Sequence, residues 1–187
     1  MLTEDFDGYF YDFTTEKNHT YLGNGVIISN TATSGIVAAE KDGKGIVGVA
    51  PKAKLLFAKC IDDTGNGSPS ALVQGVLWAI EQKADIISIS AGMFVDFQPL
   101  HEVIKKAVVL NIIVISAAGN TGLQQFDVAY PARYPEVIGV AAYDQKREIA
   151  PYSSRGINVK FAMPGSDMYV LWLNNQYCKL SGTSFSC

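Results

Sequence analysis

Two short segments of small and polar residues carry the side chains best suited to chemistry. Residues 181–187 read Ser-Gly-Thr-Ser-Phe-Ser-Cys and bring several hydroxyl groups together. A serine hydroxyl is a weak nucleophile until a base removes its proton. Residues 116–122 read Ser-Ala-Ala-Gly-Asn-Thr-Gly and directly follow an apolar run, so Asn120 is expected at the end of a buried strand. Taken alone, Gly-Thr-Ser is a common sequence, and a small polar turn is its simplest interpretation.

The elements that must position these segments are predicted by an alternation that begins near residue 45. Short apolar runs indicate strands at residues 54–58, 86–90, 112–115, 137–140 and 159–162. Helical spacing of apolar residues follows Ser68-Pro69, a favourable helix start, and recurs at about residues 100–110. This order predicts an α/β fold in three layers, with a mostly parallel sheet and helices on both faces. Function in such folds gathers in loops after the strand ends, here at residues 91–92, 117–120 and near Ser184.

The composition predicts an ordered globular protein. Hydrophobic residues make up 48% and charged residues 18% of the 187 residues, and a single domain over residues 1–187 is expected. The formal net charge is −3 and no basic run is longer than a pair such as Lys105-Lys106, so no nucleic-acid partner is predicted. No apolar run approaches the roughly 20 residues that span a bilayer, so no membrane partner is predicted. The oligomeric state is left open.

The cysteines and the first residues indicate the compartment. Cys60, Cys178 and Cys187 form no Cys-x-x-Cys pair, so neither a disulfide framework nor a zinc site is predicted. An odd, sparse set of cysteines suits a reducing compartment. The start, MLTEDFDGYFYDF, is acidic and aromatic, unlike the basic and then apolar pattern of a secretion signal. Both features predict a cytoplasmic location.

Three segments that occur in a fixed order change the interpretation of the Gly-Thr-Ser motif. Residues 46–51 read Ile-Val-Gly-Val-Ala-Pro, and together with residues 116–122 and 181–187 they resemble the subtilisin-like serine peptidases, the subtilase family. Further similar segments lie at residues 81–92, 130–140, 153–156, 162–165 and 177–184. The resemblance covers about residues 33–187 without a large gap and is greatest to the intracellular branch of the family. It implies an incomplete subtilisin-like fold.

The resemblance also implies roles for individual residues. Ser184 corresponds to the nucleophile, and Asn120 corresponds to the side-chain donor of the oxyanion hole, a contribution worth about 3 kcal/mol. A peptide or protein substrate in extended form would add as a strand between two backbone ledges. The ledges are formed by Ser90, Ala91 and Gly92 on one side and by Gly65, Asn66 and Gly67 on the other. Ala129 stands where the family commonly has glycine at the pocket floor, so a shallower pocket is expected.

The chain departs from the family at the catalytic histidine. The family carries it in a His-Gly-Thr-His-Val-Ala-Gly segment shortly before Gly-Val-Ala-Pro. Two alignments of this stretch place either Ser29 or Val26 at the histidine position, and neither is a base. His19 lies ahead of that position in a poorly matched stretch. His101 falls on the second predicted helix, where a plain surface histidine is expected.

The catalytic aspartate also has no counterpart. Residues 3–8 resemble the loop that follows it, with Asp5 or Asp7 as the acid of that loop, so the aspartate is expected to lie before Met1. The family continues past the nucleophile into a long apolar helix, whereas this chain stops at Cys187. These departures predict a domain shortened at both ends.

Asp42 falls where the family has a loop that carries calcium ligands. A hard cation needs several oxygen ligands, and the family's partner from the N-terminus is absent here. Asp42 is therefore predicted to be a turn residue. No metal and no cofactor are predicted, with calcium as the one ion left open.

Three interpretations follow from these losses. The chain is a truncated or degenerate peptidase with little or no activity alone, a non-catalytic peptide-binding or regulatory protein, or a fragment of a split gene whose neighbour supplies the missing parts. In subtilisin itself, the enzyme on which the effect is known, loss of the nucleophile or the histidine lowers turnover about 2 × 10⁶-fold.

Overall fold

The computed structural model describes residues 22–23, 26–27, 30–61, 67–122, 128–172 and 176–187. The chain divides into two compact units. The first unit comprises residues 1–68 and 169–180, and the second unit comprises residues 69–168 and 181–187. The expectation of a single domain over residues 1–187 stays a prediction.

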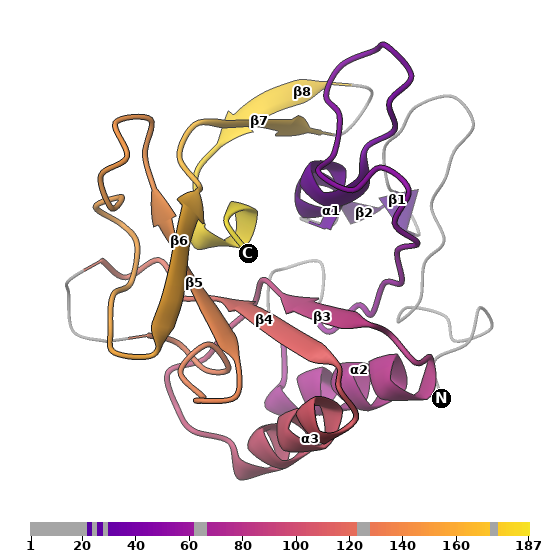
Figure 1. Ribbon diagram of the computed structural model, residues 1–187, viewed down its shortest axis with the longest axis vertical. Helices are drawn as coiled ribbons and strands as arrows, with labels where there is room; N and C mark the ends of the chain where they lie inside the picture. Colours follow the sequence, from indigo (N-terminus) through magenta and orange to yellow (C-terminus); the bar gives the residue numbers. More distant parts are fainter. Residues whose placement is uncertain (1–21, 24–25, 28–29, 62–66, 123–127, 173–175) are drawn as a thin grey trace. The chain divides into compact units, whose positions relative to one another are not determined.

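A four-stranded parallel sheet forms the centre of the second unit (Figure 1). Its strands lie in sequence order, β3 (Ile86–Ile89), β4 (Ile113–Ala117), β5 (Ile138–Tyr143) and β6 (Val159–Pro164). Parallel neighbours must be joined by crossover connections, and among the described residues only the connection from β3 to β4 contains a helix. The predicted α/β class and parallel sheet are confirmed.

Two helices of the second unit follow from the apolar spacing. They are α2 (Pro69–Glu81) and α3 (Gln98–Val109), and α3 packs against both α2 and β4. Leu100, Ile104 and Ala107 lie one turn apart on α3 and are fully buried. The helix ends at Val109 and is capped by Leu110; Asn111, which follows, has a left-handed φ of 61°, and Ile112 N–H bonds back to Ala107 O at 3.0 Å. None of the described helices has the length and apolar character that a membrane crossing requires.

The two faces of the sheet differ in exposure. Along β3 and β4 alternate side chains point to opposite faces, so Ile87 and Val114 are buried whereas Ile86 and Ile113 are 55% and 48% exposed. Both α2 and α3 lie on one side of these strands (Figure 1). The described residues of this unit therefore show an incomplete version of the three-layer fold.

The first unit contains elements that the sequence did not predict. They are β1 (Leu22–Gly23), β2 (Val26–Ile27) and α1 (Asn30–Ala38), followed by the two-stranded sheet of β7 (Met168–Leu171) and β8 (Tyr177–Leu180). Two glycines let the backbone in and after α1 lie close to the side chains of the β7–β8 sheet. A Cβ on Gly35 would lie 2.8 Å from Leu171 Cδ1, and the Tyr177 hydroxyl fills the space where a side chain on Gly45 would stand.

The strand predicted at residues 54–58 is wrong. These residues form no strand, and only Ala58 takes part in an isolated bridge. An apolar run indicates burial, but a strand also needs a neighbouring backbone to pair with, and this requirement does not appear in the local sequence.

Candidate active site

Ser184 lies in the middle of the short 3-10 helix η1 (Thr183–Phe185) and is half-buried. Its hydroxyl donates to the carbonyl oxygen of Ser90 at 3.3 Å. The hydroxyl of Ser90 donates in return to the carbonyl oxygen of Ser184, also at 3.3 Å. Because Ser90 directly follows β3, this reciprocal pair attaches the nucleophile turn to the carboxyl end of a sheet strand, where loops of α/β folds carry function.

Asn120 lies at the carboxyl end of the neighbouring strand β4 and is held by Thr183. The side-chain oxygen of Asn120 accepts hydrogen bonds from Thr183 N and from Thr183 Oγ1, both at 2.9 Å. Thr183 Oγ1 also accepts the N–H of Gly119 at 3.2 Å. With Oδ1 occupied in this way, the amide nitrogen of Asn120 is the group left to face a ligand. The structure thus places Asn120 against the turn that carries Ser184, while the roles predicted for these two residues stay predictions.

The loop that carries Asn120 is supported by Ser154. Ser154 N–H donates to Gly119 O at 2.9 Å, and its hydroxyl bonds the hydroxyl of Thr121 at 2.8 Å. Gly119 has a φ of +111°, and a Cβ there would lie 3.0 Å from Ser154 Oγ, so the position requires glycine. Thr183 and Ser154 were not singled out from the sequence, although both lie in segments that resemble the family.

Two N–H donors at this site have no hydrogen-bond partner among the described residues. They are the side-chain amide of Asn120 and the backbone N–H of Ser184. Pre-positioned N–H donors of this kind stabilise the oxyanion of a tetrahedral intermediate. The arrangement is therefore able to bind developing negative charge beside a serine hydroxyl.

The ledge formed by Ser90, Ala91 and Gly92 runs on from β3. In the described part of the chain, the backbone groups of Ala91 and Gly92 form no hydrogen bond, whereas Met93 and Tyr130 pair through two backbone bonds of 2.9 and 2.8 Å. Ala129 is buried, and its Cβ would lie 3.0 Å from a Cβ on Gly92, so the two positions adjoin.

The structure describes only one residue, Gly67, of the opposite ledge. Gly65 and Asn66 lie outside the described residues, and Gly67 belongs to the first unit, where it bridges Ile61. The roles predicted for both ledges and for Ala129 stay predictions.

No described side chain acts as a base toward Ser184. Val26 lies in β2 of the first unit, and Ser29, His19, Asp5 and Asp7 lie outside the described residues. Cys187 lies three residues after Ser184 in the sequence, and its Sγ is 3.5 Å from Ser88 Oγ. Burial raises the pKa of the Cys187 thiol, so it stays protonated at neutral pH and is not a thiolate base.

The expectation of a plain surface histidine at position 101 is wrong. His101 Nε2 lies 2.9 Å from Glu136 Oε2, and its side chain is only 17% exposed. The imidazole also stacks on the Tyr134 ring, with centroids 4.0 Å apart and planes 5° apart. A helical position beside a polar residue is expected to be exposed when only the sequence is considered. Glu136, the residue that pairs with His101, lies 35 residues further along the chain.

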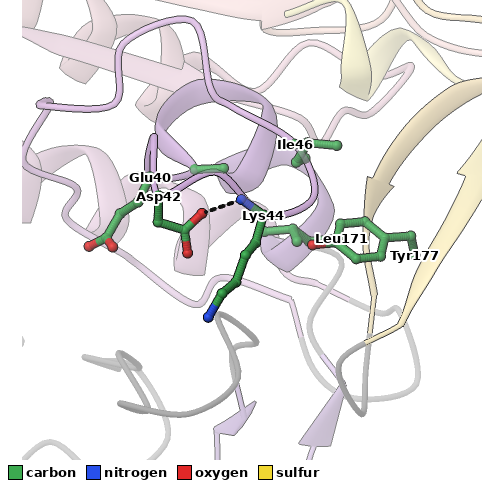
Figure 2. Close-up of a pocket in the computed structure, with 7 residues that line it drawn as sticks. Glu40, Asp42, Lys44, Ile46, Leu171 and Tyr177 are labelled. Carbon is green, nitrogen blue, oxygen red and sulfur yellow. Dashed lines mark hydrogen bonds between the residues drawn. The ribbon is translucent and has the colours of Figure 1, made fainter.

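Asp42 behaves as a turn residue. Its Oδ1 accepts the backbone N–H of Lys44 at 2.9 Å, at a pocket of the first unit that Glu40, Ile46 and Tyr177 also line (Figure 2). Two carboxylates do not by themselves provide the six to eight oxygen ligands that Ca²⁺ takes. Among the described residues, no three acidic, histidine or cysteine side chains gather at one place. Whether the chain binds calcium stays a prediction.

Comparison with known proteins identifies the family. The model of the subtilase family matches residues 30–187, which include Asn120, the ledge after β3 and Ser184. The chain belongs to the subtilase family.

Individual subtilases agree with this assignment. The chain is 39% identical over 169 residues to an intracellular serine protease of Paenibacillus polymyxa, covering 89% of this chain and 50% of that protein. It is 35% identical over 176 residues to subtilisin DY of Bacillus licheniformis, covering 93% and 63%. The structure of sphericase superposes with a TM-score of 0.76 at 30% identity, covering 83% and 58%. The chain thus spans less than two thirds of each of these subtilases.

Proposed function

We propose that this subtilase keeps the nucleophile and the oxyanion donors of a serine peptidase but has very low or no peptidase activity as the isolated chain. One observation carries the proposal: the Ser184 hydroxyl donates to the main-chain carbonyl of Ser90 and to no basic side chain among the described residues. A carbonyl oxygen accepts a hydrogen bond but does not remove a proton, and without proton removal a serine hydroxyl attacks an amide very slowly.

The chemistry left to the site follows from its groups. A peptide carbonyl next to Ser184 would place its oxygen near the N–H groups of Ser184 and Asn120, which favour the charge of a tetrahedral intermediate. The proton of Ser184 would still have to leave, and the departing amine would still need a proton. In subtilisin, binding and the oxyanion hole alone retain roughly 10³- to 10⁴-fold acceleration over water. That range is the upper limit expected for this chain.

A fluorophosphonate probe, which reacts with activated serines, tests this proposal on the purified full chain. We expect no labelling above that of the Ser184→Ala variant under conditions in which an active subtilase is fully labelled. We also expect no cleavage of an unstructured protein above that of the variant. Circular dichroism establishes that both chains are folded. Labelling that depends on Ser184 and is as fast as in the active subtilase would overturn the proposal.

A second function, peptide binding without cleavage, is favoured by the ledge. Ala91 and Gly92 offer backbone groups that have no hydrogen-bond partner among the described residues, next to the end of β3. An extended peptide would pair with them as an added strand. A blocked extended peptide should therefore bind to the Ser184→Ala variant, and the same peptide with N-methylated amides should bind at least about tenfold more weakly, because each lost hydrogen bond costs about 1 kcal/mol. Equal affinities would exclude strand addition.

The proposal includes extended peptide or protein ligands and a cytoplasmic location. Similarity to an intracellular serine protease supports the location, and membership of a peptidase family supports the ligand class. Fractionation of source cells, with the chain detected by antibody, tests the location. Recovery in the culture medium would contradict it.

A further inference from the structure

His101 and Glu136 form a partly buried pair away from Ser184. His101 lies in the first turn of α3, and its Nε2 is 2.9 Å from Glu136 Oε2. The two side chains are 17% and 26% exposed. Burial of Glu136 raises its pKa, but the hydrogen bond from His101 and the charge of Lys105 outweigh this effect and hold the pKa below its usual value. Glu136 is therefore a carboxylate at neutral pH.

Tyr134 connects this pair to the start of α3. Its ring stacks on His101, and its hydroxyl donates to Asp96 Oδ1 at 2.8 Å and accepts Phe97 N–H at 3.4 Å. Phe97 is the N-cap of α3 and provides no side-chain cap of its own. Burial raises the pKa of the Tyr134 hydroxyl well above its usual value, so the hydroxyl remains a donor. Tyr134, almost fully buried, thus binds the segment 130–136 to the beginning of α3.

The first residue of the segment 130–136, Tyr130, is bonded to the backbone next to the ledge. Tyr130 and Met93 exchange two backbone hydrogen bonds, and the Tyr130 ring lies 4.8 Å from that of Tyr134. Met93 directly follows Gly92, and Tyr130 directly follows Ala129. A chain of contacts therefore runs from the imidazole of His101 through Tyr134 and Tyr130 to the backbone of the ledge.

We propose that His101 is a positioning residue whose charge sets how firmly the segment 130–136 holds the ledge at Gly92. An imidazolium binds the Glu136 carboxylate by charge and hydrogen bond, whereas a neutral imidazole keeps only the hydrogen bond. The pair is therefore tighter with a charged imidazole than with a neutral one, and the Met93–Tyr130 pairing opens more often in the neutral state. That this changes ligand affinity rests on the proposed peptide-binding function of the ledge.

The charged and titratable groups around the pair support this direction. Lys105 from α3 favours the Glu136 carboxylate, and Lys160 Nζ bonds the neighbouring Pro135 O at 2.7 Å. Neighbouring groups on the same elements are Glu102, bonded by Gln98 and Lys105, and Asp96, Tyr134 and Arg133. Imidazole is the side-chain type in this set whose charge ordinarily changes between pH 5.5 and 8.

Hydrogen exchange of the full chain measures the opening directly, without any ligand. The amides of Met93 and Tyr130 are followed at pH 5.5 and 8.0 and corrected for the intrinsic exchange rate. We expect about two- to five-fold less protection at pH 8.0, the range for a partly exposed ion pair. His101→Gln, which keeps a donor but not a charge, should show the lower protection at both pH values. Glu136→Gln should do the same and is the second variant if the first does not fold.

The amides of α2 (Pro69–Glu81) are the internal control, because they lie outside the contact chain. An unchanged pH response in His101→Gln, or an equal response in α2, would overturn the proposal. Affinity for the blocked extended peptide is then measured at both pH values. If the peptide does not bind at either pH, the peptide-binding function fails, while the exchange data still decide the role of His101.

Discussion

Thr183→Val is the substitution that best tests how the nucleophile turn is held. Valine keeps the shape of threonine but has no hydroxyl. The change removes the bond from Thr183 Oγ1 to Asn120 Oδ1 at 2.9 Å and the bond from Gly119 N–H to Thr183 Oγ1 at 3.2 Å. The backbone bond from Thr183 N to Asn120 stays, so the turn should keep its position while losing stability.

The magnitude follows from the number of lost bonds and from burial. Each hydrogen bond contributes about 1 kcal/mol net, and a buried N–H left without a partner costs about 1–3 kcal/mol. Thr183 is 1% exposed, but Gly119 is only half-buried and water can reach part of its N–H. We therefore expect the free energy of unfolding to fall by about 2 kcal/mol, a large share of the roughly 5–15 kcal/mol typical of domains.

Urea unfolding followed by tryptophan fluorescence and by circular dichroism measures this loss. The midpoint should shift while the slope with denaturant stays the same. Thr183→Ser keeps the hydroxyl and loses one methyl group, so its cost should be about 1 kcal/mol. If the valine variant loses less stability than the serine variant, the Thr183 hydroxyl holds neither the turn nor Asn120.

Two further predictions concern other parts of the chain. Gly45→Ala should destabilise the first unit more than Gly43→Ala, because both have left-handed φ values, of 60° and 81°, but only the Gly45 position meets a side chain, that of Tyr177. Gly43→Ala is the control and should lower the free energy of unfolding, measured with urea, by about 1–2 kcal/mol through backbone strain alone. Equal losses in the two variants would show that Tyr177 does not pack against Gly45. Glu136 has a pKa held below its usual value, so it stabilises the fold above about pH 4 and this contribution is lost as the pH falls through its folded pKa. The urea midpoint should therefore fall less steeply between pH 6 and pH 3 in Glu136→Gln than in the unchanged chain. An equal fall in both would refute the pairing with His101.

Local patterns in the sequence predicted the regular elements of the second unit. Residues 86–90, 112–115, 137–140 and 159–162 correspond to β3 to β6, and the apolar spacing after Pro69 corresponds to α2. These elements follow from periodicity, because the residues that must be buried recur at the spacing of a strand or a helix. Resemblance to known motifs predicts Ser184 and Asn120 as members of one site, and Thr183 connects the segments that carry them.

Contacts between distant segments decided what the local sequence could not. Residues 54–58 have the composition of a buried strand, yet they form none, because pairing depends on a neighbour. The partner of His101 lies 35 positions away, and Thr183 reaches Asn120 across 63 positions. The sequence alone determined which residues can do chemistry and which apolar runs could form strands or helices. Only the tertiary structure decided that the Ser184 hydroxyl donates to a backbone carbonyl and that His101 is covered, because both depend on which chain segments pack next to each other.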